Sequence, residues 1–166
     1  MIDFMNYVGG KDKKTFGLYY IKLGILLFYA LWFLIACVTN VINLLNALDI
    51  INAWKFNSGN LLALKNLIFK FDASYLLLGL LFISGVFVQA FSSMLFFLAS
   101  FAFWRERNKW KLINLAFAIS MMLWAAFVII EEIFIDYSYE PTHLRLLALE
   151  LVSLLAFHLL ADETKK

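Results

Sequence analysis

Hydrophobic positions along the chain gather into four long segments that are separated by short polar or charged stretches. The segments cover about residues 18–40, 75–97, 112–133 and 144–161. A helix needs about 20 apolar residues to cross roughly 30 Å of hydrocarbon, and each segment approaches or exceeds that length. None shows the strict alternation of a membrane-barrel strand, and each is too long for one. The pattern therefore predicts four transmembrane helices.

The one long connection, residues 46–74, has a pattern of its own. Four polar residues at three-residue intervals lead into it: Asn40, Asn43, Asn46 and Asp49. They predict a polar ridge on a helix that is leaving the membrane. After the turn signal NSGN come four apolar residues on one helical face: Leu61, Leu64, Ile68 and Phe71. We expect a short amphipathic interfacial helix, acting either as a lid over the outer end of the bundle or as a binding surface for a partner or lipid.

Composition supports a membrane location. Of the 166 residues, 64% are hydrophobic and 16% are charged, and the mean hydropathy is +0.83. An ordinary soluble domain is about half apolar and about a quarter charged. A soluble core of this size could not enclose so much Phe and Leu, so the excess is expected to face lipid. The predicted fold class is all-α: residues 1–166 form a single four-helix membrane domain, with the interfacial helix in its first extracytoplasmic loop.

The distribution of Lys and Arg predicts the orientation. Ten basic residues are expected on one side of the membrane: Lys11, Lys13, Lys14, Lys22, Arg105, Arg107, Lys109, Lys111, Lys165 and Lys166. Four are expected on the other side: Lys55, Lys65, Lys70 and Arg145. Positive charge accumulates on the cytoplasmic side, so both termini are placed in the cytoplasm, most simply in a bacterial-type inner membrane. The net charge of +2 sits in short clusters and does not suggest a nucleic-acid partner.

The first hydrophobic segment has two alternative interpretations. Lysines followed by a hydrophobic run are also typical of a signal peptide, and the sequence LIAC, ending at Cys37, resembles a bacterial lipobox. However, apolar residues continue beyond Cys37 in VTNVINLL. This continuation favours a thiol packed within a transmembrane helix over a lipidated one.

Small and polar residues predict which helix faces meet, because lipid gives helices no hydrophobic reason to associate. The second span carries such a face: Gly85, Gln89, Ser92, Ser93 and Ser100. A face of the third span would comprise Asn114, Ala118, Ala125 and Glu132. A stripe on the fourth comprises His143, Leu147, Glu150, Leu154 and Phe157, with His158 at its edge. Together with Asn40 and Asn43, these faces predict a bundle with a polar seam inside, toward which Trp32 and Trp124 point.

A cluster of ionisable residues is predicted at the outer end of the hairpin between the third and fourth spans. It comprises Glu131, Glu132, His143, Arg145 and Glu150. The spacing from Asn114 predicts that Glu132 points into the seam and Glu131 points away. Three uses are open: a structural ion pair of Arg145 with either adjacent glutamate, an ion or proton site centred on Glu150, and a metal site built from Glu132, His143 and Glu150. Metal-binding spacings such as HExxH are absent, which makes the metal site the weakest.

Sequence motifs do not support catalysis. The chain has no GxSxG, P-loop or GxGxxG motif and no pair of cysteines, and we assign no catalytic residue, metal or cofactor. The favoured function is a small non-enzymatic membrane protein that self-associates or joins a larger membrane complex, with the lipid bilayer as its surroundings. The alternative is an oligomeric ion, proton or small-solute transporter that uses Glu132 and Glu150. An intramembrane enzyme is the third possibility.

Overall fold

The computed structural model describes the backbone of residues 2–56, 58–72, 74–105 and 109–160, and side chains from residue 17 onward within these ranges, residue 54 excepted. These ranges contain helices and no strand. The elements are α1 (Ile2–Ala47), the 3-10 helix η1 (Trp54–Phe56), α2 (Asn60–Phe69), α3 (Tyr75–Trp104), α4 (Lys109–Ile133) and α5 (Glu140–Leu159). Four helices are long and apolar enough to cross a membrane: Gly17–Ala47 of α1, α3, α4 and α5. The predicted all-α fold with four spans and one short helix is confirmed.

Local chemistry explains where the spans begin and end. α3 starts at Tyr75 because the Ser74 side chain accepts a hydrogen bond from the Leu77 N–H at 3.3 Å, which satisfies one free donor of the first turn. α5 starts before the predicted residue 144 because Pro141 lies in its first turn, where a missing N–H is tolerated. α1 continues past residue 40, so its asparagines stand on a helix.

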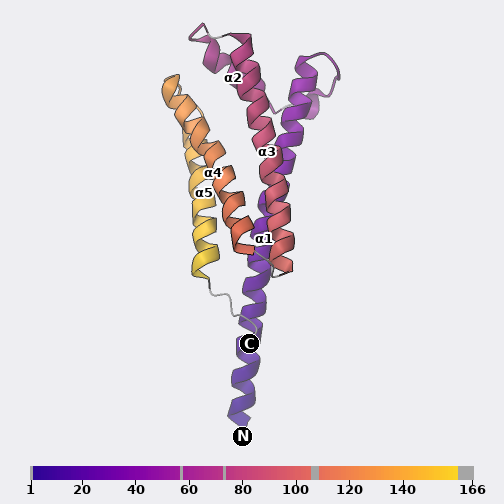
Figure 1. Ribbon diagram of the computed structural model, residues 1–166, viewed down its shortest axis with the longest axis vertical. Coiled ribbons are helices and arrows are strands. Elements are labelled where there is room, and N and C mark those ends of the chain that lie inside the picture. Colours follow the sequence, from indigo (N-terminus) through magenta and orange to yellow (C-terminus); the bar gives the residue numbers. More distant parts are fainter. Residues whose placement is uncertain (1, 57, 73, 106–108, 161–166) are drawn as a thin grey trace.

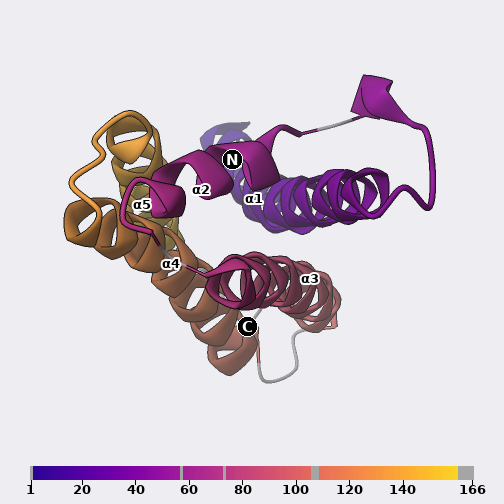
Figure 2. The same ribbon diagram turned by 90° about the horizontal axis from the view of Figure 1, so that it is seen from above.

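The four spans form a horseshoe when seen from above (Figure 2). α1 packs along α3, α3 along α4 and α4 along α5. Toward one end, α4 and α5 lean away from α1 and α3 (Figure 1). α2 lies across this end between α5 and α1 (Figure 2). We name the end that carries α2 the lid end, and the end at which α1 starts and α5 finishes the terminal end.

Aromatic side chains close the bundle toward its terminal end. The buried rings come from all four spans: Tyr29, Phe33, Phe96, Phe103, Phe117 and Phe157. Tyr29 stacks on Phe96 with a centroid distance of 5.2 Å, and Phe96 meets Phe117 edge-on at 5.0 Å. The Ser93 hydroxyl donates to the Ala30 carbonyl at 2.9 Å and so joins α3 to α1. Rings and small hydroxyls together draw the helices close here.

Two polar contacts bring α1 to α5 at this end and complete the closure. Lys22 is 1% exposed, and its Nζ donates to the Leu160 carbonyl, the C-cap of α5, at 2.7 Å. The same ammonium lies 5.8 Å from the ring centroids of both Trp110 and Phe157. The Tyr29 and Ser153 hydroxyls are 2.9 Å apart. A cation at a helix C-terminus is favourable because the last carbonyls carry partial negative charge.

At the lid end, the predicted polar ridge of α1 holds the following loop against the bundle. Asn40, Asn43 and Asn46 are all buried. Asn46 Oδ1 accepts from the Ala53 N–H at 2.9 Å, and Asn43 Nδ2 donates to the Ser58 hydroxyl at 3.0 Å. The asparagines therefore replace the backbone partners that an irregular loop lacks.

The far end of α2 is tied to the opposite side of the bundle. Lys70, the C-cap of α2, lies 2.5 Å from Asp136 in the α4–α5 connection. The rings of Phe71 and Phe134 meet edge-on, with centroids 5.3 Å apart. One end of α2 is thus held by α1 and the other by the α4–α5 hairpin, so α2 bridges the two sides of the horseshoe.

Most of the surface of the spans is apolar and faces outward. In the most hydrophobic stretch of each span, only 11–33% of the residues are buried inside the protein. Large exposed side chains are spread over all four spans; Leu31, Phe87, Leu115 and Val152 are examples. Such a surface requires an apolar solvent. Cys37 lies half-buried within the uninterrupted α1, as expected for a packed thiol.

The described helices place the start of α1 and the end of α5 at the same end of the bundle (Figure 1). Which side of the membrane this end faces stays a prediction from the basic residues. Six of those residues lie outside the described side chains: Lys11, Lys13, Lys14, Arg107, Lys165 and Lys166.

The predicted inward face of α4 is wrong. Ala118 and Glu132 are exposed. The buried face instead comprises Ile113, Ala116, Phe117, Ser120, Leu123, Trp124 and Glu131. The two faces differ by one residue, or about 100° around the helix. Small residues suggested the first face, but aromatic packing and polar contacts with α5 bury the second.

We predict that Lys22→Met lowers the stability of the folded protein by about 2 kcal/mol, because the α5 C-terminus loses a charged hydrogen-bond donor in a buried position. Thermal unfolding in detergent, followed by circular dichroism, measures the change. Lys111→Met is the matched control, since it removes the same charge from an exposed position on α4. Equal unfolding temperatures for the two variants would show that the Lys22–Leu160 hydrogen bond does not stabilise the bundle.

Candidate functional site

A cavity of about 520 Å³ lies beneath α2, where the two sides of the horseshoe diverge. All five α-helices contribute to its wall, and most of the lining is apolar. Pockets that hold small organic ligands usually measure about 300–1,000 Å³ and combine apolar walls with a few polar groups. The cavity has the size and character of such a pocket.

Amides form the polar part of one wall. The Asn40 Nδ2 donates to the Gln89 Oε1 at 2.9 Å, which joins α1 to α3 well inside the bundle. The Asn40 Oδ1 accepts from the Ser58 hydroxyl at 2.7 Å and from the Asn60 Nδ2 at 2.8 Å. Gln89 is 14 residues into α3, so this pair lies about 21 Å below the start of that helix. Asn40 therefore fixes both the depth of the cavity and the near end of the lid.

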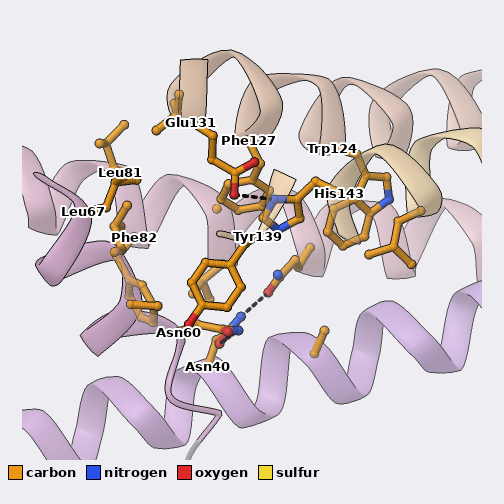
Figure 3. A pocket seen from close by; sticks show the side chains of 18 of the residues that line it. Asn40, Asn60, Leu67, Leu81, Phe82, Trp124, Phe127, Glu131, Tyr139 and His143 are labelled. Carbon is orange, nitrogen blue, oxygen red and sulfur yellow. Dashed lines mark hydrogen bonds and ion pairs between the residues drawn. The ribbon is translucent and has the colours of Figure 1, made fainter. Parts of the chain in front are cut away.

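A carboxylate and an imidazole form the opposite wall. The Glu131 Oε1 lies 3.0 Å from the His143 Nδ1, which joins α4 to α5. The imidazole packs against two aromatic rings: its centroid is 4.9 Å from that of Phe127 and 5.9 Å from that of Trp124, with both pairs nearly parallel. Figure 3 shows Glu131 and His143 facing Asn40 and Asn60 across the cavity, with Tyr139 between them.

Glu131 carries an unsatisfied atom. Its residue exposure is 5%, and its Oε2 has no hydrogen-bond partner. Among the described residues, two other buried side-chain atoms also lack partners, Asn46 Nδ2 and Ser92 Oγ, and neither residue lines the cavity. An unpartnered buried polar atom is costly, and a carboxylate oxygen more so than an amide or hydroxyl. Glu131 Oε2 is therefore the natural contact point for a ligand.

Glu150 lies below the cavity and is fully partnered. It is 2% exposed; its Oε1 accepts from the Trp124 Nε1 at 2.7 Å, and its Oε2 is in hydrogen-bond contact with the Ser120 hydroxyl. The indole of Trp124 thus separates Glu150 from His143. The predicted stripe on α5 is confirmed in that Glu150 and Phe157 are buried and His143 is half-buried.

The predicted orientation of the adjacent glutamates is wrong, since Glu131 is buried and Glu132 is exposed. The reason is the face of α4, which is set by Trp124 and by contact with His143. The predicted ion pair is also not formed: in the described chain, Arg145 is exposed and no salt bridge joins it to either glutamate. The prediction relied on Arg145 and the glutamates lying at a similar depth in the hairpin. However, Arg145 is two residues from His143 and so lies on another side of α5.

The proposed metal ligands do not converge. Glu132 points away from the bundle, while Glu150 bonds to Ser120 and Trp124. Among the residues that the structure describes, no group of three His, Cys, Asp or Glu side chains is placed to hold a metal ion.

The predicted packing residues form inter-helix contacts in several places. Gln89, Ser92 and Ser93 are buried on α3. Asn114 on α4 is exposed, but its Oδ1 is 3.0 Å from the His158 Nε2 on α5. Sequence reasoning missed Phe127, Asp136 and Tyr139 as cavity residues. The spacing of Trp124, Phe127 and Glu131, at i, i+3 and i+7, was a usable signal for one shared helical face.

A smaller groove of about 280 Å³ lies between α3 and α4. It shares four lining residues with the main cavity: Leu81, Gly85, Phe127 and Ile130. A Cβ built on Gly85 would lie 3.7 Å from the Phe127 Cζ, so this ring packs against bare backbone. The small size of Gly85 lets Phe127 stand between the two hollows.

Comparison with protein-family models, with curated proteins and with solved structures found no match to this chain.

The pKa of Asp136, at the edge of the cavity, leads to a testable prediction. Its pKa is lowered from 3.8 to about 2, chiefly by the hydrogen bond from Lys70 and then by Ser138. A carboxyl whose pKa falls on folding adds stability above its unfolded pKa and loses it as the pH drops through the folded value. We therefore expect the Lys70–Asp136 contact to persist at pH 4.

Carboxyl NMR of the Asp-labelled protein in micelles measures this titration. In Lys70→Met, the pKa of Asp136 should rise toward its ordinary value, because the main cause of the shift is gone. An unchanged pKa in that variant would show that Lys70 does not hold Asp136.

Proposed function

We propose that this chain is a small, non-enzymatic integral membrane protein that binds an amphiphilic molecule in the cavity beneath α2. One observation carries the proposal: the wall of an apolar cavity of about 520 Å³ holds a buried carboxylate oxygen, Glu131 Oε2, that has no hydrogen-bond partner. A ligand with a polar head and an apolar body would satisfy both parts of this wall.

The architecture supports binding of a molecule that resides in or near the membrane. The cavity lies between transmembrane helices, and its lining on α3 runs from Leu81 to Gln89, or about 12 Å along that helix. Its polar groups are few and sit on opposite walls, so they can orient one end of a ligand. The predicted orientation places α2, and with it this end of the cavity, on the outer side of the membrane.

The cavity wall gives less support to an intramembrane enzyme. Glu131 and His143 form one acid–base pair. Among the described lining residues there is no Ser, Thr, Cys or Lys to act as a nucleophile beside that pair. Ligand binding would involve both the apolar lining and the polar groups of the wall, whereas catalysis would involve only the Glu131–His143 pair.

The proposed partners are those that would cover the exposed apolar faces of the spans. The lipid bilayer surrounds the four helices, and self-association or entry into a larger membrane complex would cover part of these faces. In either case the cavity stays within one chain, because all five α-helices that line it belong to the same subunit.

Ion or proton transport is the second candidate. The observation that favours it is Glu150, a carboxylate that is 2% exposed. It lies within the membrane span α5, nine residues after Pro141. Buried ionisable groups within membrane spans often serve proton or ion movement. Its predicted partner was Glu132, but that residue is exposed, so the transport site would need Glu131 or no second carboxylate.

Photolabelling in nanodiscs tests the binding proposal. We expect an alkyl alcohol bearing a diazirine to label the cavity wall, and excess unlabelled alcohol to suppress that labelling. Peptides from the lipid-facing side of α5 should be labelled without saturation. Peptide mass spectrometry separates the two. Labelling of the cavity wall that does not saturate would contradict a specific site.

A filled cavity should abolish the saturable labelling. Gly85→Leu places an isobutyl group against Phe127 and into the hollow, so we expect at least about a tenfold loss of affinity, or about 1.4 kcal/mol. Ala90→Leu is the matched control, because Ala90 is an exposed residue of the same helix. Equal affinity in the two variants would place the binding site elsewhere.

A flux assay separates the second candidate from the first. If Glu150 serves transport, Glu150→Gln should abolish proton or cation flux in liposomes while its thermal unfolding stays close to that of the wild type. For a binding protein, the wild type itself shows no flux above that of empty liposomes. Flux that survives Glu150→Gln would exclude Glu150 as the transport site.

A further inference from the structure

The cavity contains more acidic than basic groups. The ionisable side chains among its described lining residues are Glu131, Asp136, His143 and Tyr139, and none of those residues is Lys or Arg. Asp136 is already paired with Lys70 at the edge of the cavity. Glu131 is therefore the one lining carboxylate in this part of the chain with an oxygen still unpartnered.

The contact between Glu131 and His143 uses only one of the two carboxylate oxygens. The His143 Nδ1 lies 3.0 Å from the Glu131 Oε1. An imidazole with its proton on Nδ1 donates to Oε1, and the second oxygen of Glu131 remains open. The imidazole is held in place by its contacts with the Phe127 and Trp124 rings, and its hydrogen bond then orients Glu131.

The surroundings of Glu131 also suit a cation. Tyr139 presents its aromatic ring to the same cavity (Figure 3), and ring faces attract cations. On the opposite wall, the Gln89 Oε1 accepts one hydrogen bond from Asn40 and can accept a second from a head group. The rest of the wall is apolar and matches a hydrocarbon body.

We propose that the ligand is an amphiphile with a primary ammonium head, and that the ammonium donates a charge-assisted hydrogen bond to Glu131 Oε2. This inference rests on the proposed binding function and adds the chemical class of the ligand. Three donors on one small cation match an open carboxylate oxygen and nearby amides, and hydrogen bonds between opposite charges are about twice as strong as neutral ones.

Three probes with the same diazirine-bearing alkyl chain test the class of the head: an ammonium, an alcohol and a sulfonate. Saturable labelling of the cavity wall in nanodiscs of zwitterionic lipid gives an affinity for each. We expect the ammonium to bind at least about tenfold more tightly than the alcohol, and the sulfonate to bind most weakly.

Two adjacent glutamates provide the variant and its control. Glu131→Gln keeps the shape of the side chain and removes its charge, so the ammonium should lose at least about tenfold in affinity while the alcohol binds as before. Glu132→Gln makes the same chemical change on the exposed side of α4 and should alter neither probe. Unchanged alcohol binding also shows that the Glu131→Gln variant is folded.

The outcomes distinguish the two proposals. If all three probes saturate with equal affinity, or if Glu131→Gln leaves ammonium binding unchanged, the ammonium inference is overturned and the binding function stands. If the sulfonate binds most tightly, the inference is likewise overturned. If no probe shows saturable labelling of the cavity wall, the binding function itself fails.

Discussion

Hydrocarbon leaves no water to bond buried polar groups, and this constraint organises the whole bundle. Each buried polar side chain that joins two helices does so by finding a partner on the other helix. Asn40 meets Gln89 between α1 and α3, and Trp124 meets Glu150 between α4 and α5. Lys22 serves the same purpose for α1 and the end of α5. Because nearly every such group is matched, the Glu131 oxygen that is not matched stands out as the place where another molecule is required.

The cavity results from the different ways in which the two ends of the bundle are held. At the terminal end, stacked rings and the Lys22 contact draw all four spans together, because aromatic faces pack closely and the cation satisfies a helix end. At the lid end the asparagines of α1 bond to α3, to the following loop and to the start of α2, and α2 occupies the width between the two sides. The helices therefore diverge toward α2. The same contacts that hold the lid in place keep the cavity open beneath it.

Hydropathy alone was sufficient to predict the four spans, because the length of an apolar run and the thickness of a bilayer are directly related. The short helix followed from the NSGN turn signal and the apolar residues on one helical face. The stripes on α3 and α5 could also be predicted, since Gln89 and Glu150 are rare polar groups whose burial in a partnered seam is strongly favoured. The face of α4 could not. The spacing of small and polar residues suggested that the face with Ala118 and Glu132 is buried. The tilt and rotation of α4 are set by packing against its neighbours, which a single sequence does not contain. An error of one residue exchanged the roles of Glu131 and Glu132. The cavity itself depends on how far helices diverge, and no local pattern encodes that.

Trp124 decides how the two inward carboxylates can be used. Its indole N–H donates to Glu150, and the indole has no second nitrogen that could accept a proton from His143. Its contact with His143 is one of stacked rings at 5.9 Å, not a hydrogen bond. A proton cannot pass along this route by side chains alone, so Glu131 and Glu150 occupy separate environments although Trp124 contacts both Glu150 and His143, the partner of Glu131. Glu150, with a donor on each oxygen, holds α4 and α5 together. Glu131, with one oxygen held and one open, faces the cavity. This division of roles favours a binding site above a structural carboxylate over a continuous path through the membrane.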